Sequence, residues 1–372
     1  MKNAITFFSA FALAAGTFFG LQVSDSESSG NHVTFYQTHT ERSLSDVHRD
    51  IKINREATVL GAGDSLFSVM SDIEESDDWE TGFYEHHEEI ESAIRSADAA
   101  VSGLDTGLAN QLPDVFLEHV RSLAEAGFSM FSLRGSSSRD ARSALVHLDS
   151  TGAAYSGIYD TKDGSHAFRK EMINGLTFAF LSFTHTDNEA EPASSGDSLL
   201  FSRMEDREMK EAIKTARDQS DIVVLNLHFP QEQQQDPGSY QTAVSTMAAE
   251  AGADIIFGHN PDALQPFEWL HTSDGRKVFT AYSLGTISGS GTAQNQSISG
   301  LAGVTVKDIE AGPASYIIVD DPVFYPVFFE KTAQGNNSDI ITGDFVNGNN
   351  DLFSEAEEHV GRWMDDLRSG WD

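Results

Sequence analysis

Three apolar runs, each followed by polar residues, constrain the fold of this chain more than any other feature. Residues 221–227 lead into His228, residues 253–257 lead into His259, and a third run covers residues 278–282. Uninterrupted apolar runs separated by helix-like segments are typical of parallel strands that are covered on both faces. Ligands of such α/β sheets bind outside the carboxyl ends of the strands. The pattern therefore predicts a layered α/β domain whose chemistry lies near the two histidines.

The preceding part of the chain shows the same alternation of strands and helices. Strands are expected at residues 57–60, 97–101, 128–133 and 176–183, and helices at residues 113–126 and 141–148. Asp64 and Asp105 follow the first two of these strands. Each aspartate could cap the next helix or bind a ligand, and both interpretations remain open. The Gly- and Ser-rich residues 288–300 are expected to form a flexible surface loop.

Composition excludes several classes of function. A hydrophobic content of 39% over 372 residues is sufficient for a large core, and the absence of cysteine excludes disulfides, thiolate metal sites and cysteine nucleophiles. The formal net charge of −34 argues against nucleic acid as a partner, because phosphates would be repelled over most of the surface.

The N-terminus predicts export. Lys2 precedes an uncharged stretch over residues 5–23, which is close to the roughly 20 residues that span a bilayer as a helix. We expect residues 1–23 to be a signal anchor or a signal peptide, and the anchor is favoured because the small-residue site Ala12–Ala14 lies inside the apolar stretch. Residues 24–50 are polar and are expected to form a stalk. The expected location is the cell membrane with an extracellular domain, or secretion if the segment is cleaved.

The polar motifs at the strand ends occur in a specific order. They are Gly63-Asp64, Gly103-Leu104-Asp105, Arg134-Gly135-Ser136-Ser137, His228-Phe229-Pro230-Gln231-Glu232, Gly258-His259-Asn260-Pro261-Asp262 with Gln265-Pro266, and Tyr282-Ser283-Leu284-Gly285-Thr286. This order resembles the poly-gamma-glutamate capsule synthesis proteins of the CapA type, and the resemblance covers roughly residues 56–330.

The resemblance implies a calcineurin-like metallophosphatase fold, which is an αββα sandwich, preceded here by the N-terminal hydrophobic helix. The expected domain covers residues 51–330. The metal ligands that the resemblance implies are Asp64, Asp105, His228, His259 and Asp262, and the implied catalytic residues are His228 and Glu232. We expect at most one divalent ion, which could be manganese, zinc or magnesium, or none. A structural role for each histidine remains an open alternative.

Departures from the family pattern put phosphatase chemistry in question. The family has Asn-Asn-His where this chain has Gly135-Ser136-Ser137, which removes one oxygen ligand and a proton donor. Arg134 stands where the family has a small alanine. One hypothesis is that its guanidinium replaces a metal by pairing with Asp64 or Asp105; the alternative is that it points into solvent.

Residues 331–372 are expected to form a polar loop with a short strand at residues 340–341, followed by a C-terminal amphipathic helix over residues 352–367. The apolar stripe of this helix is expected to pack on the domain, and its members are Phe353, Ala356, Val360, Trp363, Met364 and Leu367.

Two functions are consistent with the sequence. In the first, the chain acts in synthesis, attachment or export of poly-gamma-glutamate or another anionic cell-surface polymer, with a metal-dependent hydrolase or transferase activity. Its partners are then that polymer or the synthesis machinery in the membrane. In the second, the chain is a catalytically inactive binding or assembly module at the cell surface.

Overall fold

The computed structural model is a mixed α/β structure built on two large sheets. It describes residues 19–22, 34–37, 51–65, 88–107, 109–135, 137–160, 168–185, 199–230, 234–260, 263–286, 298–311, 314–331, 338–341 and 350–371. The strand order of the first sheet is β17-β16-β15-β3-β4-β5-β6, and that of the second is β13-β14-β12-β11-β9-β8.

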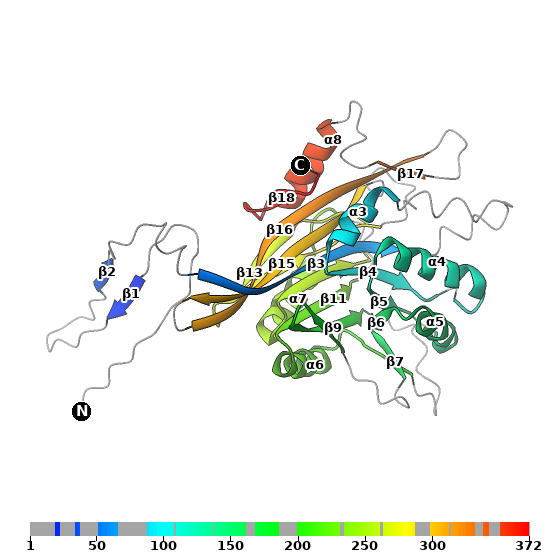
Figure 1. Cartoon of the computed structure of the whole chain (residues 1–372), viewed down its shortest axis with the longest axis horizontal. Helices are drawn as coiled ribbons and strands as arrows, with labels where there is room; N and C mark the ends of the chain where they lie inside the picture. Colours follow the sequence, from blue (N-terminus) through cyan, green and yellow to red (C-terminus); the bar gives the residue numbers. More distant parts are fainter. Residues whose placement is uncertain are drawn as a thin grey trace.

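The first sheet joins an antiparallel part to a parallel part. Its strands are β3 (Ile51–Ser65), β4 (Ala99–Asp105), β5 (Met130–Arg134), β6 (Ala154–Ser156), β15 (Ile298–Ala311), β16 (Ala314–Lys331) and β17 (Ser338–Ile341), and the short β18 (Arg368–Ser369) pairs with β16. Strands β3 to β6 are parallel, whereas β15 pairs antiparallel with both β3 and β16. These three long strands run side by side across the molecule (Figure 1).

The second sheet contains the apolar runs that the sequence singles out. Its strands are β8 (Arg169–Ile173), β9 (Leu176–Thr184), β11 (Ile222–His228), β12 (Ile255–His259), β13 (Phe267–His271) and β14 (Lys277–Ala281). Strands β9, β11, β12 and β14 are parallel, as predicted. Because His228 and His259 are register partners on β11 and β12, the two rings lie side by side at the carboxyl ends of these strands.

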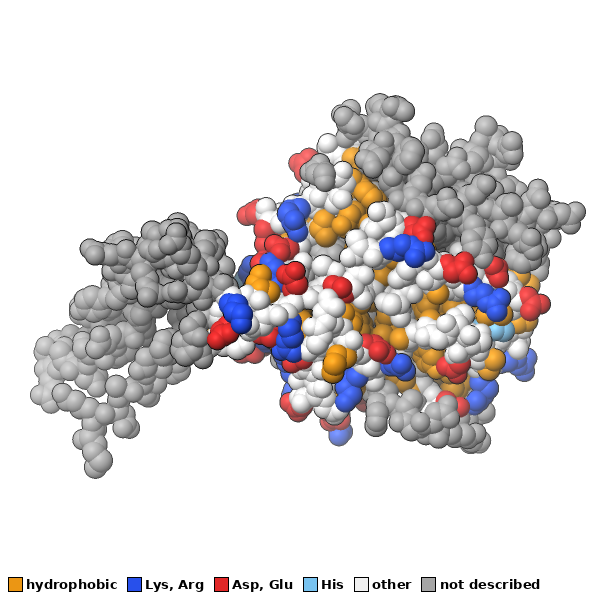
Figure 2. Space-filling model, in the orientation of Figure 1, with side chains coloured by type: hydrophobic (Ala, Val, Ile, Leu, Met, Phe, Trp, Pro, Cys, Tyr) orange, Lys and Arg blue, Asp and Glu red, His pale blue; other side chains and the backbone are white. Residues whose placement is uncertain are grey.

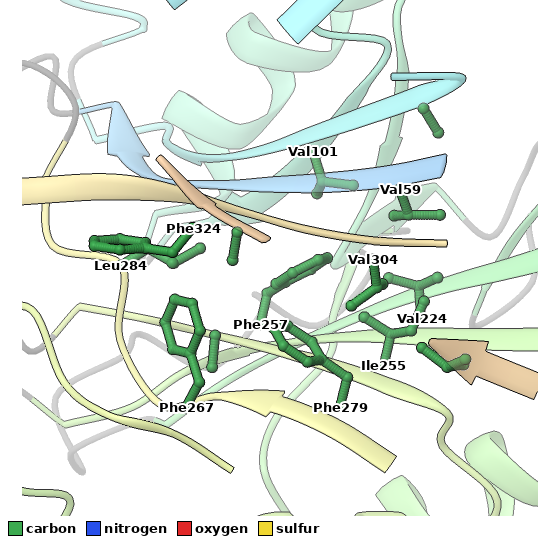
Figure 3. Close-up of a cluster of buried hydrophobic side chains, with 14 of the residues drawn as sticks. Val59, Val101, Val224, Ile255, Phe257, Phe267, Phe279, Leu284, Val304 and Phe324 are labelled. Atoms are coloured by element: carbon green, nitrogen blue, oxygen red, sulfur yellow. The ribbon is translucent and has the colours of Figure 1, made fainter. Parts of the chain in front are cut away.

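The two sheets pack face to face over an apolar core. Val59 and Val101 of the first sheet meet Val224, Ile255 and Phe257 of the second (Figure 3). All five are buried. Burial of this apolar surface is the main force that holds the two sheets together.

Helices cover both outer faces. On the first sheet lie α3 (Glu88–Ser96), α4 (Pro113–Ala126) and α5 (Ser138–Thr151), and on the second lie α6 (Asp206–Gln219) and α7 (Ser239–Ala251). The expected helix over residues 113–126 is confirmed, including its end at Gly127, which adopts a left-handed φ of 116°. The layers therefore follow the order α-β-β-α that was predicted.

The C-terminal segment packs on the domain as expected, although its helix is shorter and Trp363 of the predicted stripe is exposed. Helix α8 (Asn350–Gly361) ends six residues before the predicted end at residue 367, because the chain turns at Gly361, whose carbonyl accepts a hydrogen bond from the Met364 amide at 2.8 Å. Ala356, Val360 and Met364 are buried in the core between the sheets. The predicted strand at residues 340–341 is part of β17.

Two predictions at other places differ from the structure or lie outside it. Residues 298–300, which were expected to belong to a loop, begin β15. Most of the predicted N-terminal helix and stalk lies outside the described residues; of the apolar stretch, Phe19–Gln22 is described and forms strand β1, which pairs with β2 (Thr34–Gln37). Within the described ranges, no helix is both long enough and apolar enough to cross a membrane.

The described surface carries both signs of charge. Figure 2 shows acidic and basic side chains interspersed over one face, with apolar side chains between them.

A two-stranded sheet of β7 (Ile158–Asp160) and β10 (Leu199–Phe201) lies beside the main sheets.

Candidate metal centre

Three buried side chains from both sheets converge at one point. Asp64 comes from the end of β3, and His228 and His259 end β11 and β12. The Asp64 Oδ1 atom lies 3.3 Å from His259 Nδ1 and 3.7 Å from His228 Nδ1. One potential ligand atom from each residue lies within 4.8 Å of the others. Among the residues that the structure describes, this is the one group of three side chains that could hold a metal ion.

The far nitrogen of each imidazole is held by a polar side chain. Asn226 Oδ1 lies 3.1 Å from His259 Nε2, and Ser132 Oγ lies 2.7 Å from His228 Nε2. The amide of Asn226 is oriented by its Nδ2, which donates to the Leu181 carbonyl at 3.3 Å. Because an amide oxygen only accepts, His259 Nε2 must carry a proton. In the neutral ring the Nδ1 lone pair then faces the carboxylate of Asp64.

This arrangement favours a positive charge at the point where the three atoms meet. The Nδ1 atoms of His228 and His259 are both buried without a hydrogen-bond partner, which is costly for polar atoms. A proton on one ring would satisfy that ring and Asp64 but would leave the other Nδ1 unpaired. A divalent cation would satisfy all three atoms at once, and metal-bound histidines usually have a polar partner at the far nitrogen, as Asn226 and Ser132 provide here. The residues therefore fit a metal ion.

The electrostatic surroundings favour an ionised Asp64 and a neutral His228. Burial alone would raise the pKa of Asp64, but the imidazole of His259, together with His228 and Arg134, outweighs burial and holds this pKa well below its usual range. Burial lowers the pKa of the His228 imidazole well below its usual value, and the charges of His259 and Arg134 lower it further against the opposing effect of Asp64. Asp64 is thus ionised and His228 is neutral at physiological pH, as ligands must be.

Backbone geometry fixes the carboxylate of Asp64. Its second oxygen, Oδ2, accepts a hydrogen bond from the Asn260 amide at 2.7 Å. Asn260 adopts a left-handed φ of 85°, which turns the chain directly after His259. On the other side Gly103 faces the site, and a Cβ atom at this position would overlap Asp64 Oδ1 and lie 2.9 Å from His259 Nδ1. Any larger residue at position 103 would therefore displace the Asp64 carboxylate.

Asp105 lies outside this group of three. Its Oδ2 pairs with Arg134 Nη2 at 2.5 Å, and its Oδ1 accepts from the Gly107 amide at 2.8 Å. Arg134 Nη1 also donates to Asn260 Oδ1 at 2.5 Å. Arg134 is thus paired with Asp105 through Nη2 and with Asn260 through Nη1. Glu232 and Asp262, the remaining predicted site residues, lie outside the described residues.

Sequence reasoning missed three residues that support the centre. Ser132 and Asn226 are polar residues inside apolar buried strands, and both are fully buried. A polar residue within such a strand must find a hydrogen-bond partner, which is the signal that could have identified them. Gly103 gives a weaker signal, because a glycine within a strand often marks a close approach of another group.

The comparisons identify the family. The family model of the bacterial capsule synthesis protein PGA_cap matches residues 58–288, which is more than half of the chain and includes all three residues of the centre. The chain belongs to this family. The PGA biosynthesis protein CapA of Bacillus subtilis (strain 168) is 27% identical over 256 residues, which cover 63% of this chain and 60% of that protein. The capsule biosynthesis protein CapA of Bacillus anthracis is 28% identical over 160 residues, which cover 41% of this chain and 39% of that protein. The chain therefore matches less than two thirds of the length of these PGA_cap relatives.

Solved structures share a distant likeness with this PGA_cap member. The NAD nucleotidase NadN of Haemophilus influenzae is 14% identical with a TM-score of 0.43, over 84% of this chain and 57% of that one. A hypothetical protein from Thermus thermophilus is 15% identical with a TM-score of 0.42, over 72% of this chain and 99% of that one. Values this low support no argument about activity.

Proposed function

We propose that this PGA_cap protein acts at the cell surface in the synthesis, attachment or export of poly-gamma-glutamate or a related anionic polymer, through a metal-dependent hydrolase or transferase centre at Asp64, His228 and His259. The observation that carries the proposal is the pair of buried, unpartnered Nδ1 atoms that face an ionised carboxylate. The family and the names of its CapA relatives support the polymer as the substrate class.

The ligand set suits catalysis. Three protein ligands leave further coordination positions open, as in catalytic zinc sites, and a carboxylate with two imidazoles also suits manganese. A bound ion would supply Lewis acidity towards a carbonyl or phosphoryl oxygen and towards a water. Asn226 and Ser132 keep the two imidazoles in place, and the Asn260 amide keeps Asp64 in place.

The negative net charge favours a local cation as the point of contact with an anionic polymer. The chain carries a formal charge of −34, so an anionic polymer is repelled by most of its surface. Arg134 and a bound divalent ion would provide positive charge at the centre itself. Productive contact with the polymer would then be confined to this centre.

The test measures metal binding and polymer turnover on the full-length chain. After metal removal with EDTA, titration with Zn²⁺ or Mn²⁺ is expected to give saturable binding and a higher melting temperature. Poly-gamma-glutamate incubated with the loaded protein is expected to become shorter and to gain free amino groups. His259→Ala should abolish both effects. His271→Ala is the matched control, because His271 is exposed at the end of β13, whose antiparallel direction places it at the opposite end of the sheet.

The outcomes separate the proposal from its alternative. Absence of metal binding by the folded wild-type protein would refute the metal-dependent centre. Metal binding and polymer retention without any change in the polymer would favour the inactive binding module. That second candidate is supported by the pairing of Asp105 with Arg134, which occupies a carboxylate that the family resemblance assigns to metal binding.

A further inference from the structure

We propose that the guanidinium of Arg134 takes the place of a second metal ion, so that the centre holds a single divalent cation. The inference rests on the proposed function, because it assumes that Asp64, His228 and His259 bind the first ion. It goes further by assigning a role to Arg134 and by fixing the number of ions at one.

Arg134 is placed beside the centre by two adjacent strands. Asp105 and Arg134 are register partners at the ends of β4 and β5, so their side chains leave the same face of the sheet. A continuous series of contacts then leads to the centre: Arg134 contacts Asn260 through Nη1, and the Asn260 amide donates to Asp64 Oδ2. The side chain of Arg134 is 24% exposed, so its charge is only partly screened by solvent.

Arg134 engages two oxygens beside the centre that could otherwise ligate a second ion. Asp105 Oδ2 and Asn260 Oδ1 both lie 2.5 Å from its guanidinium nitrogens. Carboxylate and amide oxygens are common ligands of divalent cations. The same oxygens cannot serve a metal ion while the guanidinium holds them, and a second ion beside Arg134 would meet a like charge.

The loop after β5 offers no substitute ligand at residue 135. A Cβ atom on Gly135 would overlap Thr106 Oγ1, so a ligating side chain at this position does not fit without rearrangement. Arg134 also remains charged at any working pH, unlike a metal ion, whose occupancy depends on supply. The second positive charge of this centre is therefore permanent.

The experiment counts ions on metal-depleted, full-length protein by calorimetric titration with Mn²⁺ and by elemental analysis. The wild-type protein is expected to bind one ion. Arg134→Ala is expected to bind two, because it releases Asp105 and Asn260, and the electron paramagnetic resonance spectrum should change from that of isolated Mn²⁺ to that of a coupled pair. Arg134→Lys should remain at one, since the positive charge is kept. Asp105→Asn in the Arg134→Ala background should return the count to one.

Each result decides between the two proposals. Two ions on the wild-type protein, or a single ion on folded Arg134→Ala, would overturn the role of Arg134 while leaving a metal centre in place. No ion on the wild-type protein would instead refute the proposed function and, with it, this inference. If circular dichroism shows that Arg134→Ala does not fold, Arg134→Met replaces it: its long side chain carries no charge and donates no hydrogen bond to Asp105 or Asn260, and a count of one on this variant would again overturn the inference.

Discussion

Substitution of Gly103 by alanine tests the centre without removing any ligand. The added Cβ would overlap Asp64 Oδ1 and lie 2.9 Å from His259 Nδ1. The carboxylate must therefore leave the position in which it faces the two imidazoles. Changing a residue that merely supports a metal ligand already costs about 10- to 100-fold in metal affinity, so displacing a ligand should cost at least about 100-fold. This factor corresponds to about 2.7 kcal/mol of binding free energy.

The loss of metal-binding free energy in Gly103→Ala should also reduce the rise in melting temperature that the metal causes. At a metal concentration of about 100 times the wild-type dissociation constant, binding stabilises the folded state by about 2.7 kcal/mol. With an unfolding entropy of about 2.1 cal/mol/K per residue, a domain of roughly 300 residues would gain about 4 °C in melting temperature. We expect Gly103→Ala to lose most of this metal-dependent shift, measured by differential scanning calorimetry with and without Zn²⁺.

Gly361→Ala is the matched control for this substitution. Its Cβ would lie 3.6 Å from the nearest atom of Leu367, which is an ordinary contact, and the position is remote in sequence from the centre. This variant should keep the full shift. If Gly103→Ala binds Zn²⁺ as tightly as the wild-type protein, the ion does not lie between Asp64 and the histidines, and the reasoning about the centre fails.

Two further predictions address the support of the centre and the long strands. Asn226→Leu removes the acceptor of the His259 Nε2 proton and should weaken Zn²⁺ affinity by about 10- to 100-fold in a calorimetric titration; an unchanged affinity would contradict the role of Asn226. The hydrogen bond from Arg55 holds the pKa of Asp308 below its usual value, although burial opposes this effect. The Arg55–Asp308 pair therefore stabilises the folded state above the unfolded pKa of about 3.9. This contribution is lost as the pH falls through the folded pKa of Asp308. Because the Arg55 side chain is 40% exposed, Asp308→Asn should lower the free energy of unfolding by less than about 1 kcal/mol at about pH 7, and urea denaturation should show the difference shrinking below about pH 4. A difference that persists unchanged at about pH 3 would refute this assignment.

The central strands and their histidines could be predicted because their signal is local. The sequence of β11 is apolar at nearly every position. Such a run is typical of a strand that is buried on both faces of its sheet. Strand ends in parallel sheets meet at one edge, so the proximity of His228 and His259 follows from the sequence. The helix at Pro113–Ala126 was equally predictable, because proline and glycine mark its two ends.

Features that depend on distant partners could not be predicted from local signals. Strand β15 pairs with β3 across a long stretch of intervening chain, as the Arg55–Asp308 contact at a separation of 253 residues shows. The sequence also did not reveal that Asp64 and Asp105 have different partners. Only the structure shows that Asp64 joins the histidines while Asp105 joins Arg134.

The assembly of one centre from two sheets has a consequence for folding kinetics. Asn260 and Asp64 are 196 residues apart, and Ser132 and His228 are 96 apart, so the complete centre exists only after the sheets have docked. We expect contacts between such distant residues to form after the transition state, because closing long loops is slow. Interactions absent from the transition state change the rate of unfolding and leave the rate of folding nearly unaltered. A bound ion should therefore slow unfolding. The rate of folding would be the same with or without metal, and the rate of unfolding would be lower when metal is bound.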